Sequence, residues 1–232
     1  MCGRYVLNAP EDLSERFQLR QLAITLPHSW NVSPTSSMPV IIEIAEEGRQ
    51  GRTMKWGLIP RWSKPGDTKA IAPINARAET LAEKPMFRGL IKNRRCLVPA
   101  NGFYEWKKTG NYKQPYFISV ADNDLFTFAG LYDESKGEEG DVVASYTIIT
   151  TSANDVMSSI HDRMPVILDE EDEDEWLDSA LTDAGAIRHL LGPYPADKMV
   201  IYPVSREVNN VRNNRPELIE QIDEKVAGQA RS

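Results

Sequence analysis

The 232-residue sequence contains only two cysteines, Cys2 and Cys96, and they form no Cys-x-x-Cys pair. This argues against a disulfide framework and against a zinc site built from cysteines. No apolar run approaches the about 18 residues of a membrane span. The first residues also lack the basic and apolar regions of a signal peptide. We therefore expect no membrane association and a cytoplasmic or nuclear-type compartment.

The chain also lacks a glycine-rich phosphate loop and any metal-ligand spacing, so we expect no cofactor and no metal. It has only three histidines, His28, His161 and His189. His161 lies in the polar cluster 159–165, and an imidazole is a natural proton shuttle near neutral pH. A structural histidine that bonds a backbone group fits this position equally well. His28 and His189 lack comparable surroundings, and we expect them to be structural.

The charge of the chain is unevenly distributed. Its net charge is −7, yet residues 52–113 contain 14 Lys and Arg against 4 Asp and Glu, which leaves −17 for the remainder. A local excess of +10 is typical of a surface that binds a polyanion such as nucleic acid. A basic surface that only faces solvent remains the alternative.

Length and composition predict one domain covering residues 1–232, with a polar tail at 217–232 that frays. Strands are expected where β-branched and aromatic residues cluster, and short helices where acidic residues or Asn and Ser begin an apolar segment. The expected strands are 39–44, 53–59, 96–106, 115–120, 125–132, 144–150, 166–168 and 200–204. A hairpin-like turn is expected at 107–113, with Gly110 and Asn111. The expected helices begin near residues 8, 87, 154, 169 and 184, whereas segment 30–35 is expected to be irregular. Leu13, Phe17 and Leu19 or Leu22 would form the buried side of the first helix. Because strands outnumber helices, the fold class is α+β with a curved or barrel-like antiparallel sheet.

Cys2 becomes the N-terminal residue if Met1 is removed. It then carries a thiol beside a free α-amine, and such a 1,2-aminothiol condenses with an aldehyde to a Schiff base that closes to a thiazolidine. Both groups are usable near neutral pH, since their reference pKa values are about 8.5 and about 7.7–8.0. A cysteine at position 2 of a frayed terminus without any role is the alternative reading.

Glu105 lies within the aromatic apolar run 102–106. Strict alternation places it on the same face as Phe103, but alternation alone does not decide between a solvent face and a pocket. In a pocket its pKa would rise, and it would become a candidate general acid or base. Asn75 and Arg77 lie two residues apart, where an amide can bond a sugar or carbonyl oxygen and a guanidinium can bind a phosphate.

Further candidates for a nucleic-acid surface are spread through the chain. Arg4, Arg88 and Arg163 are candidate phosphate ligands. Trp62, flanked by Pro60, Arg61 and Ser63, is the best candidate for stacking on a base, although most tryptophans are core residues. Cys96 lies in an apolar strand and is expected to be inert packing.

The sequence resembles the SRAP family, the SOS-response-associated peptidase-like proteins, through seven motifs that occur in order. They are MCGRY at 1–5, WNVSP at 30–34, MKWGLIP at 54–60, NARAET at 75–80, RCLVPA at 95–100, GFYEW at 102–106 and IHDRMP at 160–165. A weaker match continues through 205–214. No motif position departs from the family pattern.

The resemblance implies curved antiparallel β-sheets that form a barrel-like core around a central channel, flanked by helices. It implies that Cys2 crosslinks to abasic sites in single-stranded DNA through a thiazolidine, which shields the lesion. By the same resemblance Glu105 assists proton transfers, His161 acts at the opened sugar oxygen and in crosslink reversal, and Asn75 holds Cys2 or the sugar. Arg4, Arg77 and Arg163 would bind the flanking phosphates. The resemblance further implies removal of the protein's own N-terminal residue.

Abasic single-stranded DNA is thus the expected partner of a monomeric, nucleoid-associated protein, or of a nuclear one in a eukaryote. Two alternatives remain at this point. One is a cysteine peptidase with Cys2 as N-terminal nucleophile, which would turn over many peptide molecules. The other is a non-enzymatic reader of single strands, which would bind equally well with Cys2 blocked.

Overall fold

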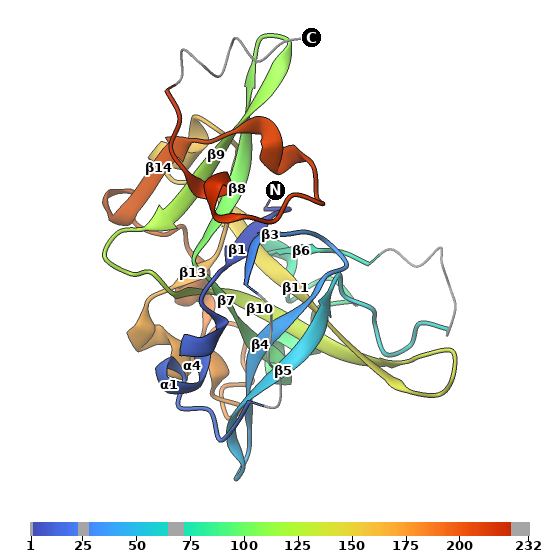
Figure 1. Cartoon of the computed structure of the whole chain (residues 1–232). Coiled ribbons are helices and arrows are strands. Elements are labelled where there is room, and N and C mark those ends of the chain that lie inside the picture. Colours follow the sequence, from blue (N-terminus) through green and yellow to red (C-terminus); the bar gives the residue numbers. More distant parts are fainter. Residues whose placement is uncertain (1, 23–27, 65–71, 224–232) are drawn as a thin grey trace.

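The computed structural model describes residues 2–22, 28–64 and 72–223. Five strands close into a barrel in the order β11, β10, β7, β4, β5 and back to β11 (Figure 1). Their bounds are β4 Ser37–Ile44, β5 Gly48–Trp56, β7 Arg95–Ala100, β10 Phe126–Lys136 and β11 Val142–Ser152. Four of the pairings are antiparallel, and the parallel pairing of β5 with β11 closes the ring. Closure leaves these five strands without an open edge between them.

Short strands extend the barrel sheet. Their bounds are β2 Gln21–Leu22, β6 Asn75–Arg77, β12 Arg163–Pro165 and β13 Ile167–Leu168. β6 runs parallel to β11, and β12 pairs antiparallel with the end of β11. The C-terminal part of β11 therefore pairs with two segments, about 70 and about 15 residues away in sequence, one on each of its edges.

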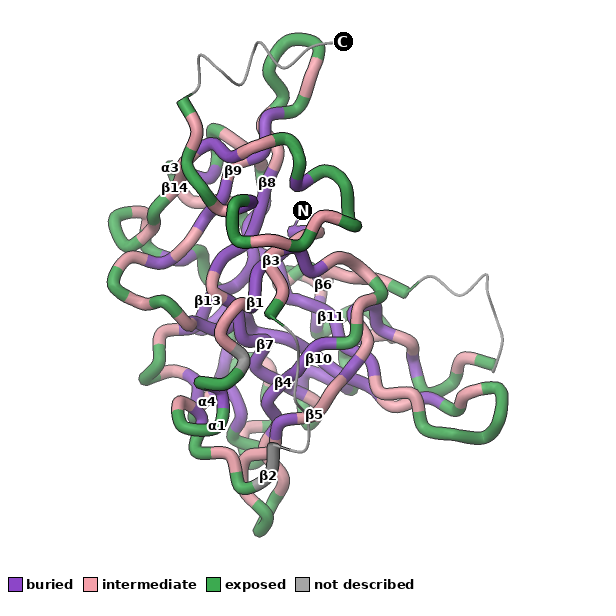
Figure 2. The backbone as a smooth tube through the Cα atoms, viewed as in Figure 1, coloured by how far each residue is buried: buried purple, intermediate pink, exposed green. Residues whose placement is uncertain are grey.

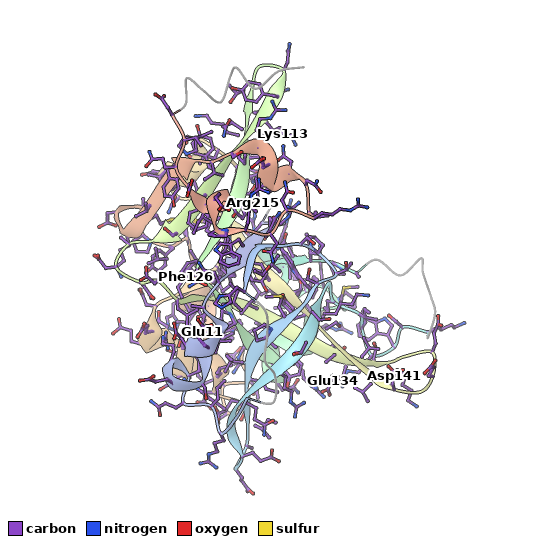
Figure 3. All side chains as sticks on the ribbon, in the orientation of Figure 1. Glu11, Lys113, Phe126, Glu134, Asp141 and Arg215 are labelled. Carbon is purple, nitrogen blue, oxygen red and sulfur yellow. The ribbon has the colours of Figure 1, made fainter. Side chains whose placement is uncertain are left out.

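A second, fully antiparallel sheet has the order β14, β9, β8, β1, β3. Its strands are β1 Tyr5–Leu7, β3 Ser29–Val32, β8 Gly102–Thr109, β9 Tyr112–Val120 and β14 Met199–Pro203. The hairpin from β8 to β9 turns at Gly110 and Asn111, as expected, and Gly110 takes a φ of +57° that favours glycine. Figure 3 shows Lys113 near this hairpin and Asp141 at the far end of the β10–β11 hairpin.

The core occupies both faces of β8. Buried segments concentrate in the barrel strands and in the strands that lie against them (Figure 2). Phe103 belongs to the large barrel cluster, whereas Tyr104 belongs to a smaller cluster with Val204 and Leu218. In the large cluster Tyr5 donates or accepts a 2.8 Å hydrogen bond with Tyr146, whose ring stacks on Trp56. Because both faces of β8 are covered, this strand is buried through most of its first half.

Helices are short. The α-helices are α1 Leu13–Arg16, α2 Leu90–Asn93, α3 Asp155–Ser158 and α4 Glu173–Leu177. The 3-10 turns are Pro10–Asp12, Ala78–Thr80, Glu170–Asp172, Arg188–Leu191, Ala196–Lys198, Arg206–Asn209 and Pro216–Ile219. Asn154 caps α3, since its side chain accepts from the Met157 N–H at 3.0 Å. The barrel-like α+β fold expected from the sequence is confirmed.

The single strand expected at 96–106 is two strands, β7 and β8, which belong to different sheets. Where a helix was expected to begin near residue 184, only the 3-10 turn Arg188–Leu191 forms. Two further local expectations are wrong. Segment 30–35 was expected to be irregular, but residues 29–32 form β3, which pairs with β1 through Tyr5 and Val32. Fraying is also wrong for residues 217–223, because Leu218 is buried and Val204 forms a bridge with Gln221. In both cases pairing with a distant strand supplies the stability that local composition lacks. The rest of the expected tail, 224–232, lies outside the described residues.

None of the described helices is long and apolar enough to cross a membrane.

Candidate functional site

Cys2 lies beside Glu105 because β1 pairs with β8. The register joins Tyr5 to Phe103, and the Tyr104 N–H donates to the Arg4 carbonyl at 2.9 Å. Continuing this antiparallel register sets Gly3 opposite Glu105 and Cys2 opposite Trp106, and the Glu105 carboxylate acts electrostatically on the Cys2 thiol. In the second sheet β1 lies between β8 and β3 (Figure 1). The two conspicuous reactive groups of the sequence are therefore neighbours.

Both groups are buried. Cys2 is inaccessible to solvent, and Glu105 is only 2% exposed, so the sequence alternative of a solvent-facing glutamate is wrong. Burial raises the pKa of the Cys2 thiol well above its usual range, and the Glu105 carboxylate raises that pKa further. The Sγ donates weakly to the Arg4 carbonyl at 4.0 Å. The thiol is therefore neutral at physiological pH and needs a base before it can act as a nucleophile.

Asn75 lies at the start of β6, next to a residue that is bonded to the core residue Trp56. The Trp56 indole, which stacks on Tyr146, donates to the Ile74 carbonyl at 3.0 Å, and Asn75 follows as the first residue of β6. Among the described residues neither side-chain atom of Asn75 has a hydrogen-bond partner, although both are buried. An amide with both ends unsatisfied is costly in a folded protein unless a ligand completes it.

His161 enters from the opposite side of β11. It precedes β12, and its Nδ1 accepts from the Arg163 N–H at 3.0 Å and lies 2.9 Å from Asp162 Oδ1. In the neutral ring the acceptor role of Nδ1 puts the proton on Nε2. Protonation at Nδ1 would instead form an ion pair with Asp162. The ring is about one third exposed (29%), so it combines access to solvent with a fixed orientation.

Two of the candidate arginines contact protein groups. The Arg163 guanidinium binds Glu79 at 2.5 and 3.0 Å and donates to the Thr150 carbonyl at 2.6 Å. This ion pair lowers the pKa of Glu79. Arg4 Nη1 donates to Asn31 Oδ1 and to the Val208 carbonyl, at 2.6 and 2.7 Å. The sequence motifs gave no sign of these partners.

The other surface candidates face solvent. Arg77 and Arg88 are exposed, and Trp62 is 60% exposed, the most exposed aromatic side chain among the described residues. The segment before Trp62 is pinned to the barrel by Asp133, which is buried. Asp133 accepts from the Arg61 backbone N–H at 2.9 Å and from Arg61 Nη2 at 2.9 Å. The exposed ring of Trp62 thus follows directly after a residue whose backbone and side chain are fixed to the barrel.

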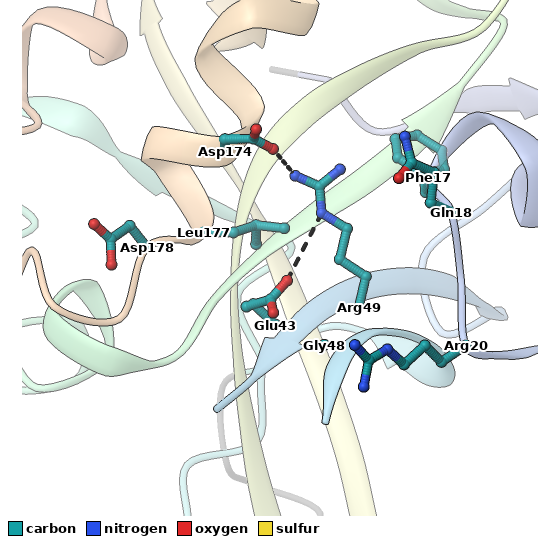
Figure 4. A pocket seen from close by; sticks show the side chains of 9 residues that line it. All are labelled: Phe17, Gln18, Arg20, Glu43, Gly48, Arg49, Asp174, Leu177 and Asp178. Carbon is teal, nitrogen blue, oxygen red and sulfur yellow. Dashed lines mark hydrogen bonds and ion pairs between the residues drawn. The ribbon is translucent and has the colours of Figure 1, made fainter. Parts of the chain in front are cut away.

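A separate cavity of about 470 Å³ lies between α1, α4 and the β4–β5 turn, away from the N-terminus (Figure 4). Three of its charged side chains are already paired, since Arg49 contacts Asp174 and also lies 3.7 Å from Glu43. In residues 2–22, 28–64 and 72–223 no three His, Cys, Asp or Glu side chains gather as metal ligands.

Comparison of the whole chain with known proteins identifies its family. The family model described as SOS response associated peptidase (SRAP) matches residues 1–211. The abasic site processing protein YoqW of Bacillus subtilis is 46% identical over 228 residues, covering 95% of this chain and 99% of its own. The mouse abasic site processing protein HMCES is 35% identical and covers 96% of this chain and 76% of its own.

A solved structure shares the fold of this chain. A crystal structure of a protein from Bacteroides thetaiotaomicron is 30% identical, covers 95% of this chain and all of its own, and superposes with a TM-score of 0.86. The extent of the family match, together with relatives above 30% identity over nearly the whole chain, is sufficient for assignment. The chain belongs to the SRAP family.

Proposed function

We propose that this protein processes abasic sites in single-stranded DNA by forming a covalent adduct through Cys2 after removal of Met1. The observation that carries the proposal is the placement of Cys2 beside the buried Glu105 carboxylate. The names of the relatives, abasic site processing proteins, supply the substrate class. An abasic deoxyribose opens to an aldehyde, which is the electrophile that a 1,2-aminothiol captures.

The reaction proceeds in two additions. The unprotonated Cys2 amine attacks the sugar C1′ aldehyde, and the resulting carbinolamine loses one water to give a Schiff base. The Cys2 sulfur then adds to the same carbon, and the thiol proton ends on the ring nitrogen. The product is a thiazolidine, one water lighter than the two reactants, with no net change in charge or oxidation state.

Each site residue has a role in this sequence. Because the Cys2 thiol is neutral, Glu105 accepts its proton during ring closure and returns one to nitrogen. Asn75 offers an unsatisfied amide to the sugar or to the Cys2 terminus. His161, with Nδ1 held by the Arg163 N–H, presents Nε2 as acid or base to the opened sugar oxygen.

The DNA interface in this proposal is built on exposed groups. Arg77 and Arg88 bind flanking phosphates, and Trp62 stacks on a base. Phosphate contacts of Arg4 and Arg163 are also proposed, and they require these side chains to exchange part of their present bonds for a phosphate. The protein acts as a monomer on this proposal.

The test mixes protein with an oligonucleotide that contains one abasic site and resolves the products on a denaturing gel. Wild type and Cys96→Ala give a shifted band, whereas Cys2→Ala gives none. Cys96 is the matched control because it is the other cysteine and is equally buried. A normal band from Cys2→Ala contradicts the proposal.

Absence of a band from wild type, with an N-terminal Cys2 verified by mass, also contradicts it and favours the peptidase reading. Peptidase activity is then measured as the number of peptide molecules cleaved per protein molecule.

A further inference from the structure

We propose that Asn31 is a positioning residue that fixes the N-terminal strand, and with it Cys2, by fastening Arg4 to the C-terminal strap, residues 206–215. The inference rests on the proposed function, because it concerns how the same site is held. Asn31 belongs to the motif at 30–34, which none of the proposed chemical steps uses.

Asn31 uses both ends of its amide. Its Oδ1 accepts from Arg4 Nη1 at 2.6 Å, and its Nδ2 lies 3.3, 3.2 and 2.8 Å from the carbonyls of Val208, Asn210 and Asn213. The residue is only 5% exposed. One side chain thus joins the N-terminal segment to a backbone about 180 residues away in sequence. Both polar atoms of the buried Asn31 side chain are therefore bonded, which favours a single arrangement of this amide.

Arg4 transmits this anchor to Cys2. Its Nη1 also donates to the Val208 carbonyl at 2.7 Å, and its guanidinium lies 5.7 Å from the centre of the Trp106 ring. The Arg4 carbonyl oxygen accepts hydrogen bonds from the Tyr104 N–H and, weakly, from the Cys2 thiol. The residue two places after Cys2 is therefore fixed through side chain and backbone together.

The strap also holds the neighbour of Glu105. Asn209 Oδ1 accepts from the Trp106 indole at 2.7 Å, and Asn214 Oδ1 accepts from the Trp30 N–H at 2.7 Å. The strap is anchored by Val208, which is fully buried. The strap consequently bonds to β3, to β8 and, through Arg4, to the segment just before β1. These contacts reinforce the pairing of β1 with β8 that places Cys2 beside Glu105.

The test compares Asn31→Ala and Asn31→Asp with Asn101→Ala. Asn101 is the matched control because its Oδ1 accepts from the Asn8 N–H at 2.8 Å, just beyond the other end of β1. All variants are made in a Cys96→Ala background so that Cys2 is the only thiol. Three quantities are measured: the crosslinking rate at saturating abasic DNA, the dissociation constant for DNA with the aldehyde reduced to an alcohol, and the rate of Cys2 alkylation by N-ethylmaleimide.

We expect both Asn31 variants to lower the crosslinking rate about 10- to 100-fold, as a displacement of about 1 Å does for reacting groups, with the dissociation constant unchanged within about twofold. Alkylation of Cys2 accelerates about tenfold or more, because the buried thiol becomes accessible. Asn101→Ala changes neither rate.

Wild-type crosslinking and alkylation rates in a folded Asn31 variant overturn the proposal. The alkylation rate needs no DNA, so it decides the positioning role even if wild type forms no crosslink and the proposed function fails. Should Asn31→Ala not fold, Arg4→Met removes the same bond from the other side, and unchanged alkylation there overturns the proposal as well.

Discussion

Replacing Glu105 by Gln separates two effects that the buried carboxylate has on Cys2. Electrostatically, the negative charge raises the pKa of the thiol, so its removal alone makes thiolate easier to form. Chemically, the carboxylate is the base beside a thiol that must lose its proton during ring closure. The two effects predict opposite changes in crosslinking rate.

The structure indicates which effect dominates. Burial is the larger cause of the raised pKa of Cys2, and the charge of Glu105 is the smaller one. The thiol of Glu105→Gln therefore remains neutral at pH 7, now without a base. Loss of general acid–base catalysis costs about 10²–10⁴ in rate. At about 1.36 kcal/mol per decade, this is about 2.7–5.4 kcal/mol of activation free energy.

The assay is single-turnover crosslinking to saturating abasic oligonucleotide, followed on denaturing gels from pH 6 to pH 9. Glu173→Gln is the matched control, because Glu173 is a second glutamate that is only 1% exposed. It bonds Arg16 and Thr127 rather than the N-terminal segment. We expect Glu173→Gln to lower stability and leave the crosslinking rate unchanged.

A rate for Glu105→Gln within about threefold of wild type, or above it, refutes the assignment of Glu105 as the base. A slow rate that recovers fully at pH 9 agrees with it, since hydroxide then replaces the missing carboxylate.

Three further predictions follow from other parts of the molecule. Trp62→Ala weakens binding to single-stranded DNA about 5- to 150-fold by titration, the equivalent of about 1–3 kcal/mol for one stacked base, and an unchanged affinity removes Trp62 from the interface. Arg61→Met lowers the free energy of unfolding, measured in urea, by about 1–3 kcal/mol; the loss is smaller than for a fully buried ion pair because Arg61 is half-exposed. An unchanged free energy of unfolding contradicts an anchoring role for Asp133. Stability also falls as pH rises: burial raises the pKa values of the Cys2 and Cys96 thiols, so above about pH 8.5 the unfolded chain loses protons that the native chain keeps. Melting temperatures that stay constant to pH 10 would show that reasoning to be wrong.

Local sequence patterns predicted the strands well because many of them carry β-branched and aromatic residues. The expected strand 144–150 lies within β11, and the expected hairpin at Gly110 is present. The helix expected near residue 8 is much shorter than the apolar spacing suggested. It ends at Arg16 because Gln18 adopts a φ of +50°, which no helix continues through.

Long-range pairing explains what the sequence left open. Alternation did not decide whether Glu105 is buried, because β8 is covered on both faces by clusters assembled from distant segments. The partners of Asn31 lie about 180 residues further along the chain, and no local motif records them. Cys2 and Asn75 were recognisable as candidates, but their surroundings depend on the pairings of β1 with β8 and of β6 with β11, which no local pattern records.

The most direct test of the central claim is mass spectrometry of the N-terminal peptide from the crosslink, with and without thiol alkylation. We predict an adduct whose mass is one water less than the sum of the peptide and the sugar fragment. Its Cys2 no longer reacts with iodoacetamide, because the sulfur is bonded to the sugar carbon. An adduct whose Cys2 thiol is still alkylated, or an adduct on any other residue, contradicts it.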